Sequence, residues 1–216
     1  MDHVKKPDKR TERARRTREK IVEAARELFV EQGYGATNLQ EVADRAGVAV
    51  QTVYYVFRNK RTLFKDVVDT AIAGDTAPVA TMDREWFRAA CAEPTAAAQL
   101  SAHVHGTRRI LERVAPVMPL IAAASATDPE IAAQWPEGEE PRYTVQHAAA
   151  RAMAGKPDLR PGVDAALIAD VFFGLLSPQL YLVLVRDRGW SPQRWEDWVL
   201  ATLRAQLCAD GEPTGP

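Results

Sequence analysis

The stretch NLQEVADRAGVAVQTVYYVF, residues 38–57, contains two short amphipathic patterns separated by a glycine. Asn38 can cap the first helix, and Glu41 three residues later completes a capping box. Gly47 is placed to end that helix, because glycine adopts the left-handed conformation that terminates many helices. The order is therefore short helix, glycine turn, short helix.

The second helix of this stretch can bury only Val53 and Phe57 on one side. Its other residues point outward or sideways: Val50, Gln51, Thr52, Tyr54 and Tyr55. A basic turn follows at once, with Arg58, Lys60 and Arg61. In a helix-turn-helix the second helix enters the major groove of DNA, where such side chains meet base edges and phosphates. The sequence predicts this motif, although tight helix pairs also occur in ordinary cores.

Helical patterns flank the motif on both sides. Residues 12–33 carry an amphipathic stripe that Gly33 is expected to end, formed by Ile21, Ala24, Ala25, Leu28 and Phe29. Asn59 is expected to cap a fourth helix with Leu63, Phe64, Val67, Val68 and Ile72 on its apolar face. Helical periodicity continues through most of the chain, without convincing strand alternation.

Composition places the chain among ordinary globular proteins. Of its 216 residues, 46% are hydrophobic and 26% are charged, which is enough to build a sizeable core. Cys91 and Cys208 lie far apart and fit neither a metal spacing nor a disulfide framework, which favours a cytoplasmic location. The first residues are charged and lack the apolar run of a signal peptide.

Charge is unevenly distributed along the chain. Residues 1–72 hold 15 Lys and Arg against 11 Asp and Glu, a net charge of +4, and the remainder carries −5. A basic amino-terminal part suits a polyanionic partner, because binding releases counterions from phosphates. A solvated charged tail is the alternative interpretation of such a run.

Residues 14–64 resemble the DNA-binding domain of the TetR (tetracycline-repressor-like) family of transcriptional regulators. The resemblance runs through "EQGY", Thr37, "VADRAGV", "TVYYVF", "NK" and "LF". It implies double-stranded DNA as a partner, a homodimer, and a small-molecule effector, expected to be largely apolar, that releases a repressor from a palindromic operator. Repression is an expectation from the resemblance, because activators share the fold.

The resemblance also implies which residues contact DNA. The matching positions are Thr37, Asn38, Ala49, Val50, Gln51, Thr52, Tyr54, Tyr55 and Lys60. Asn38 and Lys60 match phosphate contacts. The family often has serine where this chain has Ala49, so the second helix lacks a side-chain cap. Gln51 can pair with adenine, and Val50 or Ala49 can contact thymine methyl groups, which predicts an A·T-containing half-site.

The expected fold is all-α, with an N-terminal three-helix helix-turn-helix domain and a larger helical ligand-binding and dimerisation domain. The boundaries are a flexible basic arm at 1–11, the DNA-binding domain at 12–60, the helical domain at 61–210 and a flexible tail at 211–216. Residues 165–185 approach the length of a membrane span, but Asp170, Pro178 and Gln179 argue against one. This helix, kinked at Pro178, is instead expected to be buried on every side, and no membrane partner is expected.

Two further sets of residues are hypotheses for the larger domain. The ligand pocket is predicted to involve Phe87, His103, Thr107, Met118, Trp135, Tyr143, His147 and Phe172. The dimer interface is predicted to involve Phe173, Leu176, Leu180, Trp195, Trp198, Val199 and Leu203. Each of these residues could also belong to an intramolecular core.

The sequence shows no sign of catalysis or of a cofactor. His103 and His105, two residues apart on a helix, point about 200° apart and cannot share one metal ion. No nucleophile elbow, phosphate loop or HExxH pattern is present. Two rival functions stay open: a DNA-binding regulator with no ligand sensing, and a helical small-molecule carrier or enzyme whose basic front end is incidental.

Overall fold

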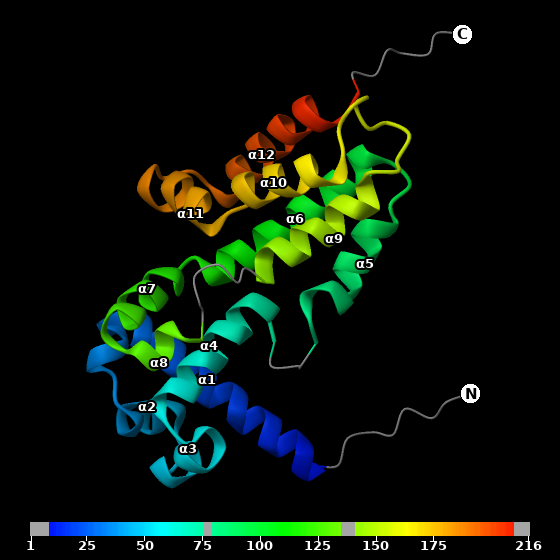
Figure 1. Ribbon diagram of the computed structural model, residues 1–216. Coiled ribbons are helices and arrows are strands. Elements are labelled where there is room, and N and C mark those ends of the chain that lie inside the picture. Colours follow the sequence, from blue (N-terminus) through cyan, green and yellow to red (C-terminus); the bar gives the residue numbers. More distant parts are fainter. Residues whose placement is uncertain (1–8, 76–78, 135–140, 210–216) are drawn as a thin grey trace. The chain divides into compact units, whose positions relative to one another are not determined.

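The computed structural model describes residues 9–75, 79–134 and 141–209 (Figure 1). Within these ranges the protein is helical, and its one strand-like contact is an isolated bridge between Leu159 and Cys208. The all-α class is therefore confirmed. The chain forms two compact units, Met1–Ala77 with Pro116–Gln134, and Pro78–Ala115 with Trp135–Pro216. We call them unit 1 and unit 2.

Unit 1 contains the amino-terminal helices and two later ones. They are α1 (Lys9–Ala36), α2 (Leu39–Ala46), α3 (Val50–Phe57), α4 (Lys60–Ala73), α7 (Met118–Thr127) and α8 (Pro129–Ala132). The apolar stripe predicted for α1 is buried, and Phe29 packs edge-on against Phe64 of α4 at 5.3 Å between ring centroids. Val53 and Phe57 of α3 are fully buried in the same core. α3 is thereby held by one face only.

Local signals in the sequence set the helix ends of unit 1. The Asn38 side chain accepts a hydrogen bond from the Glu41 N–H at 3.0 Å, and the Glu41 carboxylate accepts one from the Asn38 N–H, so the capping box is confirmed. Gly47 has φ 66° and ends α2. Gly33 has φ 85° and kinks α1, which resumes as far as Ala36 instead of ending. Ala49 provides no side-chain cap for α3, as expected.

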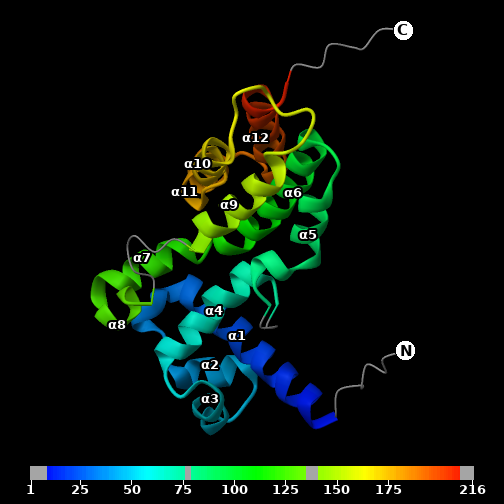
Figure 2. The same ribbon diagram turned by 45° about the vertical axis from the view of Figure 1, so that its right-hand side comes forward.

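Unit 2 contains the remaining elements (Figure 2). They are η1 (Thr81–Asp83), α5 (Glu85–Ala92), α6 (Ala96–Val114), α9 (Pro141–Met153), α10 (Ala165–Leu175), α11 (Pro178–Tyr181), η2 (Leu182–Asp187) and α12 (Pro192–Leu207). α6 packs against α5, α9 and α12, and α9 packs against α10. Ser191 accepts a hydrogen bond from the Arg194 N–H and caps α12, with Pro192 at the first helical position. The core of unit 2 lies around α6.

The apolar stretch near residue 170 differs from its prediction. Ala165–Asp187 is, in the described part of the chain, the single helical stretch long and apolar enough by length and composition to cross a membrane, a test that core helices also pass. The predicted break is present, because α10 ends at Leu175 and α11 begins at Pro178. Within the single chain this stretch is not buried on every side, since Leu167 is 47% exposed and Val183 is 49% exposed. One apolar side of this stretch faces outward.

The compact units also differ from the predicted domain boundaries. Unit 1 continues past residue 60 through α4 and includes residues 116–134. α1 begins at Lys9, so residues 9–11 of the predicted flexible arm are helical, whereas residues 1–8 and the predicted tail lie outside the described residues. The predicted division into a DNA-binding domain and a ligand-binding and dimerisation domain stays a proposal.

Candidate nucleic-acid interface

Helix α3 exposes the face opposite its buried residues. Val53 and Phe57 are fully buried, whereas Tyr54 is 53% exposed and Tyr55 is 89% exposed. Gln51 is exposed as well. Figures 1 and 2 draw α3 at the edge of unit 1, with one side uncovered by the other helices of that unit. Two adjacent exposed tyrosines with a glutamine form a surface that can hydrogen-bond and stack.

The remaining predicted contacts near α3 fall into two groups. Ala49 and Asn38 are exposed, and Val50 and Thr52 are half-buried. Thr37, in contrast, is 1% exposed, and its hydroxyl donates to the Gly33 carbonyl at 2.9 Å. The Thr37 side chain therefore shapes the turn before α2, and its contact with DNA stays a prediction.

Lys60 is also occupied within the protein. Its ammonium donates to the backbone carbonyls of Tyr34 at 2.8 Å, Thr37 at 2.9 Å and Gly35 at 3.3 Å. It also lies 4.4 Å from the centre of the Tyr34 ring. An ammonium has three N–H donors, and all three are used here. Burial lowers the pKa of Lys60. Within the single chain Lys60 joins α4 to the end of α1, and its phosphate contact stays a prediction.

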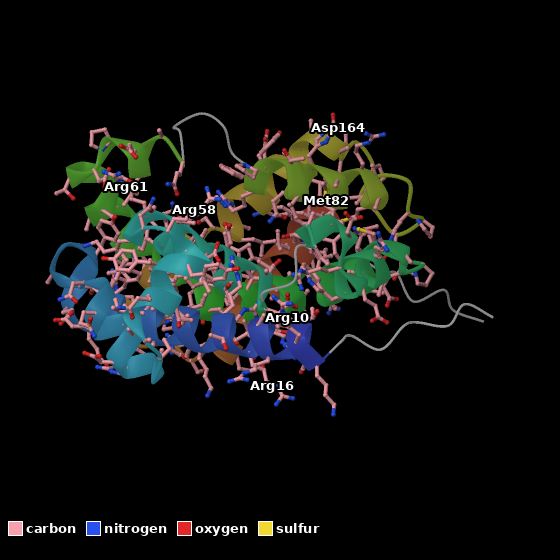
Figure 3. All side chains as sticks on the ribbon, turned by 90° about the horizontal axis from the view of Figure 1, so that it is seen from below. Arg10, Arg16, Arg58, Arg61, Met82 and Asp164 are labelled. Carbon is pink, nitrogen blue, oxygen red and sulfur yellow. The ribbon has the colours of Figure 1, made fainter. Side chains whose placement is uncertain are left out.

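Arg58 is a further basic residue beside α3, and the predicted contact set omitted it. It is exposed at the end of α3, and no partner for its guanidinium lies in the described part of the chain (Figure 3). Arg61 differs, because it donates to Asp128 at 2.7 Å and to Glu130 at 2.8 Å. Arg58 has φ 62°, a strained conformation for a side chain other than glycine. The basic turn after α3 was the feature of the sequence that could have added Arg58 to the predicted contact set.

Ion pairs reduce the positive charge of α1. Glu12 accepts hydrogen bonds from Arg15 at 2.8 Å and Arg16 at 3.2 Å, and these bonds lower the pKa of Glu12. Arg18 pairs with Asp66 of α4. In the described part of α1, four cations have no ion pair: Lys9, Arg10, Arg13 and Lys20. The residues of α1 therefore attract a polyanion less strongly than their number predicts.

Unit 2 holds a polar cluster inside its core. We define the His103 cluster as Trp86, Phe87, Gln99, His103, Gln146 and Phe172. The His103 ring stacks on Phe172 at 5.1 Å between centroids and lies edge-on to Phe87 at 6.0 Å. Its Nε2 lies 2.9 Å from the Gln146 amide oxygen. His103 is 1% exposed, and desolvation by burial lowers its pKa.

Four of the predicted pocket residues share the core of unit 2. Phe87, His103, Thr107 and Phe172 are buried in unit 2. Met118 belongs to unit 1, Trp135 lies outside the described residues, and Tyr143 and His147 stack on each other at the end of α9, with Tyr143 36% exposed. Sequence reasoning missed Gln99 and Gln146. Gln99, His103 and Thr107 recur every four residues on α6, and this spacing was the available signal.

Comparison with known proteins supports the interpretation of unit 1. Residues 21–67 match the family model "Bacterial regulatory proteins, tetR family". The amino-terminal domain belongs to the TetR family. It is similar to the HTH-type transcriptional regulator AcrR of Shigella flexneri, with 37% identity over 59 residues, which is 27% of each chain. It is also similar to the HTH-type transcriptional activator FasR of Mycolicibacterium smegmatis, with 37% identity over 79 residues, 34% of this chain and 36% of FasR.

The likeness of fold extends over nearly the whole chain. The structure of SmeT of Stenotrophomonas maltophilia in complex with triclosan matches with a TM-score of 0.69 and 22% identity, over 93% of this chain and 99% of SmeT. The curated relatives, however, are matched over only about a quarter to a third of their length. Their names as transcriptional regulators agree with the expectation that this chain is not an enzyme.

The predicted dimer residues divide by burial. Four are buried inside their own unit: Leu176, Trp195, Val199 and Leu203. Phe173 and Leu180 are half-buried, and Trp198 is 38% exposed. A fully buried side chain cannot contact a partner unless its own core opens, so the first four belong to the intramolecular core. Trp198, which lies edge-on to Trp190 at 5.9 Å, is available to a partner.

We expect Lys60→Met to change the stability of the protein and Arg58→Ala to change the salt dependence of DNA binding. Lys60→Met leaves three carbonyls without their donor and should lower the free energy of unfolding by about 1–3 kcal/mol. Arg58→Ala should leave the free energy of unfolding nearly unchanged and flatten the salt dependence of DNA binding by about one unit per subunit. Urea unfolding and DNA titrations at several salt concentrations measure both. A stable Lys60→Met protein with a flattened salt slope would return Lys60 to the phosphate backbone.

Proposed function

We propose that this protein is a ligand-responsive transcriptional regulator of the cytoplasm, which represses by binding a palindromic operator as a homodimer. The single observation that carries the proposal is the uncovered face of α3 within a TetR-family domain, with Gln51, Tyr54 and Tyr55 exposed. Large aromatic side chains are seldom left this exposed without a partner. In the major groove they would contact bases and backbone.

Different residues are proposed to recognise the bases and to contact the phosphate backbone. Gln51 can hydrogen-bond an adenine edge, which distinguishes base pairs in the major groove. Arg58 can neutralise a phosphate next to α3, which strengthens binding to any sequence. Asn38 is exposed but its side chain is used in the α2 cap, so its contact with DNA would be through the rigid start of α2. Together these residues provide specificity on α3 and affinity around it.

Dimerisation is supported by the outward apolar side of unit 2. Leu167, Val183 and Trp198 are between 38% and 49% exposed, and they lie on α10, η2 and α12. A second copy would cover such residues, and a two-fold axis would present two α3 helices to half-sites about one helical turn apart. The palindromic operator follows from this symmetry.

Ligand sensing is supported by the His103 cluster. Unpaired polar groups inside an apolar core favour a molecule that can satisfy them. The solved SmeT structure holds triclosan, and SmeT is described as the repressor of a multidrug efflux pump, which supports a small, largely apolar effector. The effector releases DNA if it binds the DNA-incompetent conformation more tightly, and this difference in affinity sets the size of the effect.

A second candidate is a DNA-binding regulator that senses nothing. The burial of the cluster favours it, because Phe87, His103 and Phe172 are at most 5% exposed and already pack against one another. Both candidates share the interface at α3. They differ in whether a small molecule enters the His103 cluster and weakens operator binding.

Selection of duplex DNA from a random library tests the proposed function. The wild-type protein is expected to enrich an inverted repeat with A·T pairs in each half-site, because two symmetric α3 helices read the same sequence. Sequencing after successive rounds measures the enrichment. A library that stays random after selection would contradict sequence-specific binding, and an enriched single site without symmetry would contradict the dimer.

A further inference from the structure

We infer that the effector carries a hydrogen-bond donor on a flat apolar body, and that His103 Nδ1 and Gln99 Oε1 are the two buried acceptors available to that donor. The inference rests on the proposed function and specifies the chemistry of its ligand. Both atoms lie in the core of unit 2, where His103 is 1% exposed and Gln99 is 0% exposed. Neither atom has a hydrogen-bond partner among the described residues. Buried polar atoms in proteins are nearly always paired, so two unpaired acceptors on one helix need a partner.

The orientation of Gln99 follows from its neighbour. One end of its amide lies 2.7 Å from the carbonyl oxygen of Ala149 on α9. A carbonyl oxygen only accepts, so the end that faces it is the NH2 group. The other end is therefore the amide oxygen, Oε1, and it is the atom left without a donor. Gln99 thus presents an acceptor to the interior.

The tautomer of His103 depends on the orientation of the Gln146 amide, which the structure places with its oxygen toward the ring. Its Nε2 faces the amide oxygen of Gln146 at 2.9 Å, so Nε2 carries the proton and donates it. In a neutral ring Nδ1 is then an acceptor. Burial lowers the pKa of His103, which keeps the ring neutral near pH 7. His103 therefore adds a second unpaired acceptor.

The two acceptors lie four residues apart on α6, hence on the same side of the helix. Aromatic rings border them: Phe172 stacks on the imidazole, and Phe87 and Trp86 lie 6.0 and 6.3 Å from it. Trp86 is half-buried, whereas Phe87 and Phe172 are buried, so Trp86 borders the solvent side of the cluster. The Trp86 ring packs directly against Gly106. A Cβ atom at position 106 would overlap the Trp86 ring.

These features select a class of ligand. Aromatic walls favour a flat apolar body, and two acceptors favour a neutral O–H or N–H group. A carboxylate would place a negative charge against two lone pairs in a desolvated site, which disfavours acidic molecules. Phenols and indole-like N–H compounds fit this description. The expected effector is therefore a neutral hydrogen-bond donor with a largely apolar body.

Three probes that share a bromophenyl body test the inference on the full-length protein: 4-bromophenol, 4-bromoanisole and 4-bromobenzoate. Calorimetry at pH 7 is expected to show 4-bromophenol binding about tenfold or more tightly than 4-bromoanisole, because only the phenol donates. The benzoate should bind most weakly. Anomalous scattering from bromine in crystals should place the phenol beside α6.

Variants then assign the preference to the two acceptors. Gln99→Met and His103→Phe should each reduce the ratio of phenol to anisole affinity severalfold, while His105→Gln should leave it unchanged. His105 is the matched control because it is exposed on the same helix and faces Glu196 at 3.2 Å. The ratio of phenol to anisole affinity is also measured on the wild-type protein. This measurement still tests the inference if a variant with a core substitution fails to fold.

The outcomes separate this inference from the proposed function. Equal affinity for phenol and anisole, bromine located away from α6, or no binding of any probe overturns the inference, provided that the same preparation binds its selected operator. A wild-type protein that enriches no DNA sequence overturns the proposed function whatever the probes do. A crystal structure with both acceptors satisfied by ordered water and no phenol at saturating concentration likewise overturns the inference.

Discussion

Gln51→Ala is expected to weaken operator binding by about 1–3 kcal/mol per half-site, and by twice that in a dimer, while the affinity for random duplex stays nearly unchanged. The reason is that Gln51 is exposed on the uncovered face of α3, where its amide can form a bidentate contact with adenine. Fluorescence titrations with the selected operator and with a scrambled duplex measure the two affinities.

Gln40→Ala provides the matched control for Gln51. Gln40 is also exposed, but it lies on α2, and its amide donates to Asp44 on the same helix at 2.8 Å. Its replacement should change neither affinity appreciably. If Gln51→Ala lowers operator and scrambled affinity equally, Gln51 contacts the backbone, and the predicted A·T preference loses its basis.

The two tryptophans of α12 are expected to give the largest contrast in stability. Trp195→Ala should lower the free energy of unfolding by about 3–5 kcal/mol, because the side chain is fully buried and packs edge-on against Tyr181 at 5.2 Å. Trp198→Arg should leave a folded protein, because Trp198 is 38% exposed, but it places a charge in the proposed interface. Urea unfolding measures the first effect and analytical ultracentrifugation the second.

Dimerisation is the link between Trp198 and DNA. A monomeric Trp198→Arg protein should lose most of its operator affinity, since only one half-site is then engaged. Trp198→Phe keeps an apolar ring and is expected to remain dimeric. A wild-type protein that sediments as a monomer at micromolar concentration would exclude the symmetric-operator model, and a dimeric Trp198→Arg protein would move the interface away from α12.

Sequence reasoning was most accurate where the determinants are local. The Asn38 cap, the Gly47 end of α2 and the break before Pro178 each depend on a few consecutive residues, and the structure has them all. Such signals act within one or two helical turns, so no knowledge of the tertiary fold is needed. The two-sided character of α3 was predictable for the same reason.

Sequence reasoning was less accurate where partners are distant in the chain. Lys60 bonds to carbonyls 23 to 26 residues away, and the resemblance that implied its phosphate contact gave no indication of these bonds. Trp195 and Trp198 fit one helical stripe, but periodicity does not say whether a stripe meets its own core or a partner. Gln99 and Gln146 are polar residues in a buried cluster, which hydrophobic patterns overlook.

The central claim is that α3 reads a specific DNA sequence, and one titration tests it most directly. Wild-type protein is titrated with the selected operator and with a scrambled duplex of equal length and composition, at several salt concentrations. The account predicts that the operator binds about a thousandfold or more tightly, and that both affinities fall as salt increases. Equal affinities for the two duplexes at every salt concentration would contradict it.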